Sequence, residues 1–179
     1  MAGYDRDKAV DYAAKFWDKV CHDGYVAVLG EAKPGKSRPT RIINVPVGTK
    51  LIGWTAPQGF SEDDCTHFIS CCIGLHGGGL SLGHHDFPPA YGSLSPRSLI
   101  KVLGGKLKPL VKDVNTSPPG IETEWIEGDL VAFGNSAGDN YQHIALHIGA
   151  SLVTCHSYSR FADDLSGVSI RPMTFLHIV

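Results

Sequence analysis

The 179-residue sequence has no long run of apolar residues and no excess of basic ones. A helix that crosses a bilayer needs about 20 consecutive apolar residues, so a transmembrane protein is not expected. The formal charge of −2 at pH 7 argues against a general nucleic-acid or anionic-membrane surface. The first residues alternate in charge and lack the apolar centre of a signal peptide. We predict a protein that is cytoplasmic or delivered by a specialised secretion route, with no nucleic-acid or membrane partner.

The patterns of disulfide frameworks and of zinc sites are also missing. Five cysteines are an odd number, and no C-x-x-C pair occurs among them. His84 and His85 lie in a segment rich in Gly and Pro, without the usual spacing of metal ligands. We therefore predict no disulfide framework, no metal site and no cofactor.

The composition is that of one loop-rich globular domain. Hydrophobic residues make up 42% of the chain and charged residues 19%, so the chain can bury a full core without disulfides. Apolar residues recur at helical spacing over residues 4–20, whereas residues 130–133 and 141–148 have the pattern of strands. We predict a single α+β domain over residues 1–179.

The stretch that begins at Ser61 carries the first indication of chemistry. Ser61 and Asp64 predict a helix start, which puts Cys65 in the first helical turn. The unpaired N–H groups and the positive end of the helix dipole favour a thiolate there, which is the form that a nucleophile needs. Cys65 also begins an apolar stripe with the spacing i, i+3, i+4, i+7, so a buried structural cysteine is the alternative.

Two histidines lie on segments that are expected to pair as strands. His143 lies on the predicted strand 141–148, and His156 follows it along the chain. If residues 150–151 form a two-residue hairpin turn, the imidazoles of His143 and His156 are diagonal neighbours on one face of the sheet. A three-residue loop would instead put His156 on the opposite face.

Four short blocks resemble amidase domains that are related to the NlpC-type cell-wall peptidases. Their sequences are DCTHFIS, GDLV, QHIAL and HSYSR, which begin at residues 64, 128, 142 and 156. The order and spacing of these blocks agree with that family. The resemblance implies a papain-like (NlpC-type) fold, in which a helix that carries the nucleophile packs on an antiparallel sheet.

The resemblance also implies a role for each matching residue. Cys65 is the nucleophile, His143 is the general base, and His156 is the third polar member, which would fix the orientation of His143. Asp64 is expected to cap the helix and support the site. Gln58 lies seven residues before Cys65, at about the distance from which a glutamine completes the oxyanion hole of papain-like enzymes; the alternative is an ordinary polar loop residue.

The chain departs from the family pattern around the expected substrate pocket. His67 replaces the family's Asn, Gln142 replaces an Asp before the histidine, and Ser159 replaces the Asp before Arg160. These departures leave the nucleophile and the base in place and bear on the substrate. We expect Trp54, His67 and Arg160 to contact it.

The expected activity is hydrolysis of a peptide or amide bond through a thioester acyl-enzyme, without a cofactor. The resemblance implies a peptide derived from the cell wall as the substrate. Two alternatives remain open. An acyltransferase would use the same triad with an acceptor other than water, and a non-catalytic binding module would use the Gly/His-rich segment 77–89 as a recognition loop.

Overall fold

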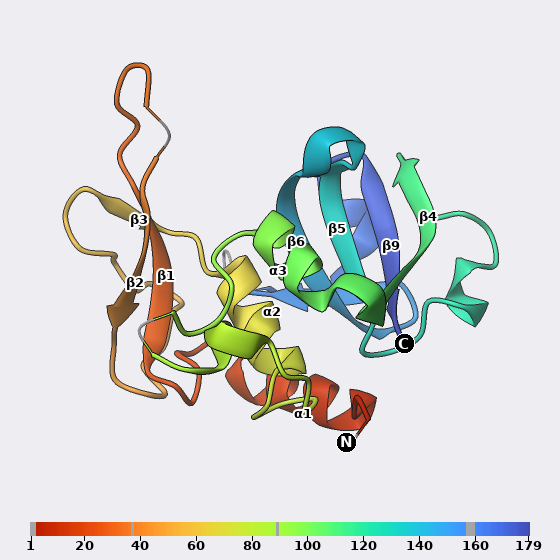
Figure 1. Ribbon diagram of the computed structural model, residues 1–179, viewed down its shortest axis with the longest axis horizontal. Helices are drawn as coiled ribbons and strands as arrows, with labels where there is room; N and C mark the ends of the chain where they lie inside the picture. Colours follow the sequence, from red (N-terminus) through yellow and green to blue (C-terminus); the bar gives the residue numbers. More distant parts are fainter. Residues whose placement is uncertain (1–2, 37, 89, 157–159) are drawn as a thin grey trace.

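The helix α2 (Cys65–Ile73) lies between two antiparallel β-sheets, as Figure 1 shows. The computed structural model describes residues 3–36, 38–88, 90–156 and 160–179, with the backbone alone at residue 160. Within these ranges the chain forms three α-helices and two sheets. The other two helices are α1 (Arg6–Phe16) and α3 (Pro96–Leu103). The predicted α+β class is confirmed.

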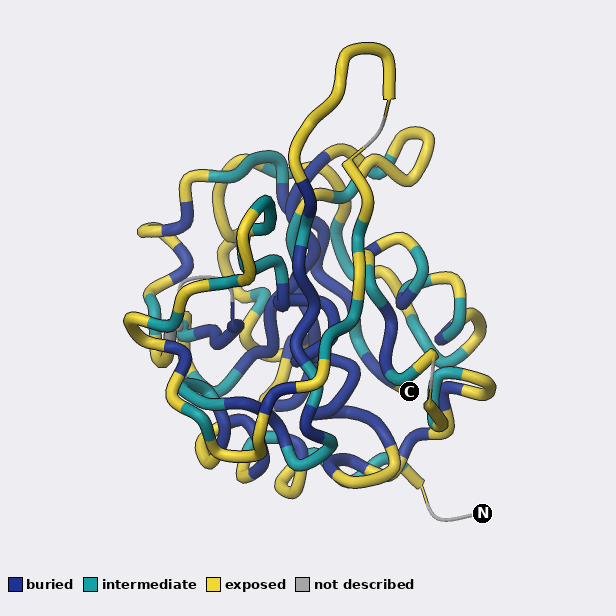
Figure 2. The backbone as a smooth tube through the Cα atoms, turned by 90° about the vertical axis from the view of Figure 1, so that its left-hand side faces the viewer, coloured by how far each residue is buried: buried dark blue, intermediate teal, exposed yellow. Residues whose placement is uncertain are grey.

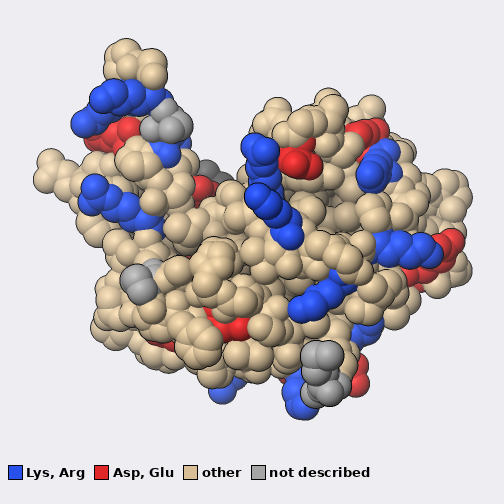
Figure 3. Space-filling view, viewed as in Figure 1, with Lys and Arg blue, Asp and Glu red and all other residues tan. Residues whose placement is uncertain are grey.

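The smaller sheet has three strands in the order β2-β1-β3. They are β1 (Tyr25–Gly30), β2 (Thr40–Asn44) and β3 (Phe60–Glu62). The segment between β1 and β2 is exposed and projects from the body of the molecule (Figure 2). In the view of Figure 3 basic side chains lie on this projection with acidic atoms beside them, and charges of both signs occur over the rest of that face.

The larger sheet has six strands in the order β4-β9-β5-β6-β7-β8, and every neighbouring pair is antiparallel. Its strands are β4 (Leu107–Val114), β5 (Leu130–Asn135), β6 (Asn140–Gly149), β7 (Leu152–Cys155), β8 (Arg160–Asp164) and β9 (Met173–Ile178). β5 and β9 are buried along most of their length because this sheet is covered on both faces.

Alternate residues of β5 and β6 supply two hydrophobic cores. One face packs against the three helices and forms the helix-side core, which contains Leu130, Ala132, Ile144, Leu146, Phe68 and Ile69. The other face forms the far-side core, which contains Val131, Phe133, Ala145, Trp125, Phe175 and Cys155. A two-residue period of side-chain direction explains this division. None of the helices in the described ranges is long and apolar enough to cross a membrane.

The helix starts follow from the local sequence at α3, and only in part at α2. Pro96 begins α3, and Ser95 forms a reciprocal capping box with Ser98. Cys65 lies in the first turn of α2, as predicted, but the helix begins after Asp64 and not after Ser61. The capping arrangement before it was predicted wrongly: Ser61 lies in β3, and Asp64 occupies the N-cap position without a side-chain cap hydrogen bond.

The hairpin of β6 and β7 has the two-residue turn, which was one of the two alternatives, and also an unexpected bulge. Gly149 pairs with Leu152 across the turn, but the next pair is His147 with Val153, which leaves Ile148 without a partner across the ladder. An extra residue on one strand shifts the register of all later pairs by one. The bulge therefore shifts the register by one residue, as a three-residue turn would have done. It puts His156 on the face opposite His143.

Candidate active site

Cys65 lies at the N-terminal end of α2 and is 3% exposed. Its sulfur is 3.7 Å from the hydroxyl oxygen of Thr66. All nine residues of α2 are buried, yet Cys65 alone of them belongs to the far-side core, together with Phe133 and Ala145. The thiol is thus held at the positive end of a buried helix, where backbone N–H groups are not used within the helix.

His143 is half-buried on β6, on the same face as Ala145. Its ring centroid is 5.5 Å from that of Phe133, which lies in the far-side core with Cys65. Burial raises the pKa of the Asp63 carboxyl, and the charge of the His143 imidazole partly offsets this effect. The nucleophile and base expected from the sequence are therefore placed in one region of the molecule, with Asp63 beside them.

His156 does not have the expected role. It is fully buried, its Nδ1 lies 2.6 Å from Asp64 Oδ2, and its Nε2 lies 2.7 Å from the carbonyl oxygen of Phe16. Its ring stacks on Phe68, with a centroid separation of 3.9 Å. Because both ring nitrogens have partners on the helix side, His156 does not orient His143. The cause is the register shift at the bulge in β6.

Asp64 is the centre of a buried polar network beneath the start of α2. It is fully buried, accepts a hydrogen bond from the backbone N–H of Ala27, and also contacts His67 and His156. Burial alone would raise the pKa of Asp64, but the charge of His67 and the hydrogen bonds of both imidazoles outweigh it and lower the pKa to about 2. Asp64 supports the site by fixing α2 to β1 and to the segment after β7, not by capping the helix.

The expectation that His67 contacts substrate was wrong. The side chain is fully buried, with Nδ1 3.0 Å from Asp64 Oδ1 and Nε2 2.9 Å from Asp23 Oδ2. Burial opposes its protonation, but the charge of Asp64 and the hydrogen bond with Asp23 hold its pKa well above the usual value. Both nitrogens are used inside the protein, so neither is directed to a substrate.

Two other expected site residues, Gln58 and Trp54, do not line the region around Cys65. Gln58 is exposed in the turn before β3, so the whole of that strand separates it from Cys65, and the role in the oxyanion hole was predicted wrongly. Trp54 is half-buried against the core of the smaller sheet, which makes it a packing residue. The side chain of Arg160 lies outside the described residues.

Sequence reasoning missed two members of the buried network, Asp23 and Cys71. Asp23 lies in the loop between α1 and β1, and no local pattern connects it to α2. Cys71 follows His67 by four residues, which puts both side chains on one face of the helix. That spacing is the one local signal for the pair, and it differs from the C-x-x-C pattern of common zinc sites.

Glu62 has a raised pKa next to this network. Burial and then the charge of Asp64 raise its pKa from 4.5 to about 7, and its Oε1 is buried without a hydrogen-bond partner among the described residues. At about pH 5 the unfolded chain has begun to ionise this carboxyl while the folded chain keeps the proton. Above about pH 7 the folded chain must also ionise it, so the full cost of burying the charge applies there.

Replacement of Glu62 by Gln is therefore expected to stabilise the protein at alkaline pH. Because Glu62 is only partly buried, solvent screening reduces the effect, and we expect about 1 kcal/mol at pH near 8 and much less at pH near 5. Urea unfolding of both proteins at the two pH values measures this. The exposed Glu124→Gln variant is the control and should show no such difference. An equal gain in the free energy of unfolding at both pH values would contradict the raised pKa of Glu62.

Comparison of the chain with protein-family models, with curated proteins and with solved structures finds no match.

Proposed function

We propose that the protein is a cysteine-dependent hydrolase of peptide or amide bonds, with Cys65 as the nucleophile and His143 as the general base. The observation that carries this proposal is the position of Cys65. It is the first residue of a buried helix and packs into the far-side core, next to the strand that presents His143. A thiol at a helix N-terminus near an imidazole is the arrangement that lowers a cysteine pKa and activates the sulfur.

Within this proposal the fold is papain-like. The support is that α2 contacts β6, the central antiparallel strand that carries His143, and also packs on α1. The four blocks that resemble the NlpC-related amidase domains lie on α2, before and in β5, on β6 and after β7. The cell-wall peptide as substrate rests on that resemblance alone.

Asp63 replaces His156 as the third polar member of the proposed site. Asp63 immediately precedes the Asp64 N-cap, and its carboxyl interacts with the charge of His143. A carboxylate near an imidazole stabilises the imidazolium that forms when the base takes a proton. His156 supports the site indirectly. Its hydrogen bond holds Asp64 in place, and Asp64 holds the start of α2.

In the proposed reaction His143 accepts the proton of the Cys65 thiol, and the sulfur attacks the carbonyl carbon of the scissile bond. The backbone N–H of Cys65, at the free end of α2, donates to the oxyanion of the tetrahedral intermediate. Collapse of this intermediate breaks the C–N bond, and His143 returns the proton to the leaving amine. Water, deprotonated by His143, then attacks the thioester and releases the acid and the thiol.

The 3% exposure of Cys65 favours a second candidate, a non-catalytic binding module of the same fold. The rate of thiol alkylation against pH separates the two. We expect Cys65 in the folded protein to react with iodoacetamide with an apparent pKa below the ordinary thiol value of about 8.5, and His143→Asn to raise that pKa. Peptide mapping identifies the labelled cysteine.

Cys155→Ala is the matched control, because Cys155 is a second buried thiol of the far-side core and should leave the alkylation profile unchanged. Cys65→Ala should lose both the fast alkylation and the hydrolysis of cell-wall peptides. Labelling of Cys65 only after unfolding would exclude the hydrolase, and so would full hydrolysis by the Cys65→Ala protein.

A further inference from the structure

Three side chains bring a carboxylate, an imidazole and a thiol together on the face of α2 that points away from the far-side core. They are Asp23, His67 and Cys71, and one ligand atom of each lies within 4.8 Å of the others. Asp23 Oδ2 is 2.9 Å from His67 Nε2 and 3.4 Å from Cys71 Sγ, and the sulfur is 3.7 Å from the same nitrogen. A loop and a helix, distant in sequence, supply the three atoms.

These separations are close to those of a tetrahedral metal site. Zinc binds carboxylate oxygen and imidazole nitrogen at about 2.0–2.2 Å and thiolate sulfur at about 2.3 Å, so tetrahedral angles place the ligand atoms roughly 3.4–3.6 Å apart. The two distances to the sulfur already fall near that range. Only the oxygen and nitrogen would have to separate, by about 0.5 Å.

The contacts of the two ring nitrogens of His67 match those of a histidine that binds a metal ion. Its Nε2 faces Asp23 and Cys71, while its Nδ1 contacts the buried carboxylate of Asp64. A carboxylate that accepts the second N–H of a metal-binding imidazole fixes the tautomer and the direction of the ring. His67 and Cys71 are separated by four residues on α2, the spacing at which two helical side chains can share one ion.

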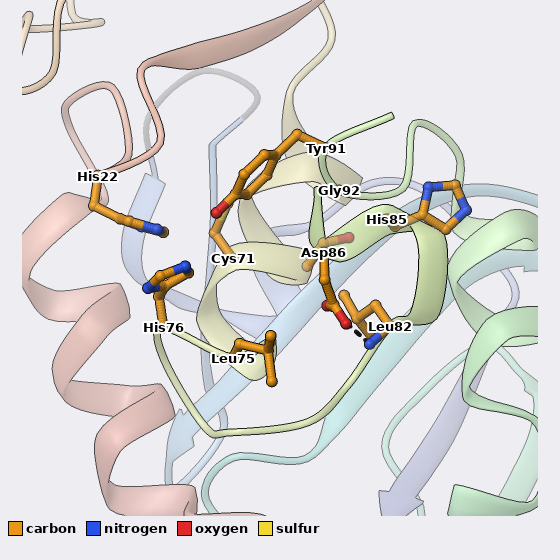
Figure 4. A pocket seen from close by; sticks show the side chains of 11 residues that line it. His22, Cys71, Leu75, His76, Leu82, His85, Asp86, Tyr91 and Gly92 are labelled. Carbon is orange, nitrogen blue, oxygen red and sulfur yellow. Dashed lines mark hydrogen bonds between the residues drawn. The ribbon is translucent and has the colours of Figure 1, made fainter. Parts of the chain in front are cut away.

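A fourth coordination position is available in a small cavity of about 20 Å³ beside the cluster. Cys71 lines this cavity together with His22, His76 and Tyr91 (Figure 4). Gly92 also lines it and lies against His67, where a Cβ would come within 2.6 Å of the ring. The volume suffices for one water molecule.

His22 supplies an independent sign of a missing ligand. Its Nδ1 is 2.6 Å from the Tyr12 hydroxyl, whereas its Nε2 is buried and has no hydrogen-bond partner among the described residues. A buried polar nitrogen that is left unpaired costs free energy, so a partner in the cavity is expected. Water bound to a metal, or the metal itself, would satisfy it.

We propose that Asp23, His67 and Cys71 bind a divalent transition metal of the zinc class, with the fourth position open to the cavity lined by His22. Binding replaces the Nε2 proton of His67 and the thiol proton of Cys71, so two protons leave for each ion. The ion would fix the loop before β1 to α2. This site is separate from Cys65 and revises the expectation, drawn from missing ligand spacings, that the chain binds no metal.

The test is metal reconstitution of the full chain after treatment with a chelator. We expect one Zn²⁺ per chain, and with Co²⁺ a thiolate-to-metal charge-transfer band together with the visible bands of a tetrahedral ion. Cys71→Ala should abolish the charge-transfer band. It should also weaken Zn²⁺ binding by more than the about 10–100-fold that loss of an outer-shell partner costs.

Two variants serve as controls. Cys72→Ala removes the neighbouring thiol of the helix-side core and should keep the band. Cys65→Ala should also keep it, so that failure of the metal site and failure of the proposed hydrolase are distinguishable. If Cys71→Ala does not fold, X-ray absorption of the zinc-loaded protein should still show one sulfur ligand among lighter ones. Folded protein that binds no stoichiometric metal, or a band that survives in Cys71→Ala, would overturn the proposal.

Discussion

Replacement of Asp64 by alanine is expected to lower the free energy of unfolding by about 3–5 kcal/mol. The carboxylate is fully buried and contacts the Ala27 N–H and the imidazoles of His67 and His156. Its removal leaves those groups buried without their acceptor, and the positive charge on His67 loses one of its two carboxylate partners. Removal of one partner from a buried ion pair costs more than the net contribution of the intact pair.

Equilibrium unfolding in urea measures this loss. An equal slope of the free energy of unfolding against urea concentration shows that the unchanged protein and the variant unfold in the same way. Asp63→Ala is the matched control, because this adjacent carboxyl is only half-buried and burial raises its pKa. We expect a change below about 1 kcal/mol for it. Asp64→Asn, which preserves the volume but not the charge, should also be destabilised. A loss below about 1 kcal/mol for Asp64→Ala would show that the network does not hold the start of α2.

Replacement of Asp129 by alanine is expected to lower the free energy of unfolding by a similar amount, about 3–5 kcal/mol. Asp129 is fully buried before β5 and forms an ion pair with Arg6 of α1. It also contacts His177 Nδ1 at 2.9 Å and accepts hydrogen bonds from the backbone N–H groups of Ile126 and Ile178, each at 3.0 Å. One carboxylate thus joins α1, the turn before β5 and the last strand.

Thermal and urea unfolding of Asp129→Ala should both show the loss, and the exposed Asp11→Ala on α1 should be close to the unchanged protein. Because Asp64 and Asp129 share no hydrogen-bond or ion-pair partner among the described residues, the losses from Asp64→Ala and Asp129→Ala should add in the double variant within about 0.5 kcal/mol. Strong non-additivity would mean that the two polar networks are energetically coupled.

The positions that were predicted correctly depend on signals between near neighbours in the chain. Cys65 was correctly placed in the first turn of a helix from Ser61 and Asp64, although neither side chain caps that helix. The strand that carries His143 follows from the alternation of apolar residues.

The positions that were predicted wrongly depend on contacts between distant segments. His156 follows the two-residue turn that would have put it on the face of His143, yet the extra residue Ile148 moves it to the helix side. His67 has the sequence position of a substrate residue, but Asp23 comes from 44 residues earlier to meet it. No local pattern encodes either event.

The sequence by itself determined the α+β class, the helix that has Cys65 in its first turn and the strand that presents His143, because helical and strand periods act over a few positions. Only the tertiary structure decided the partners of the buried charges: Asp64 with two imidazoles, and Asp23 with His67 and Cys71. The reason is physical. A buried charge must find its partner wherever the packed chain supplies one, and that choice depends on strand register and loop position more than on neighbours in the sequence.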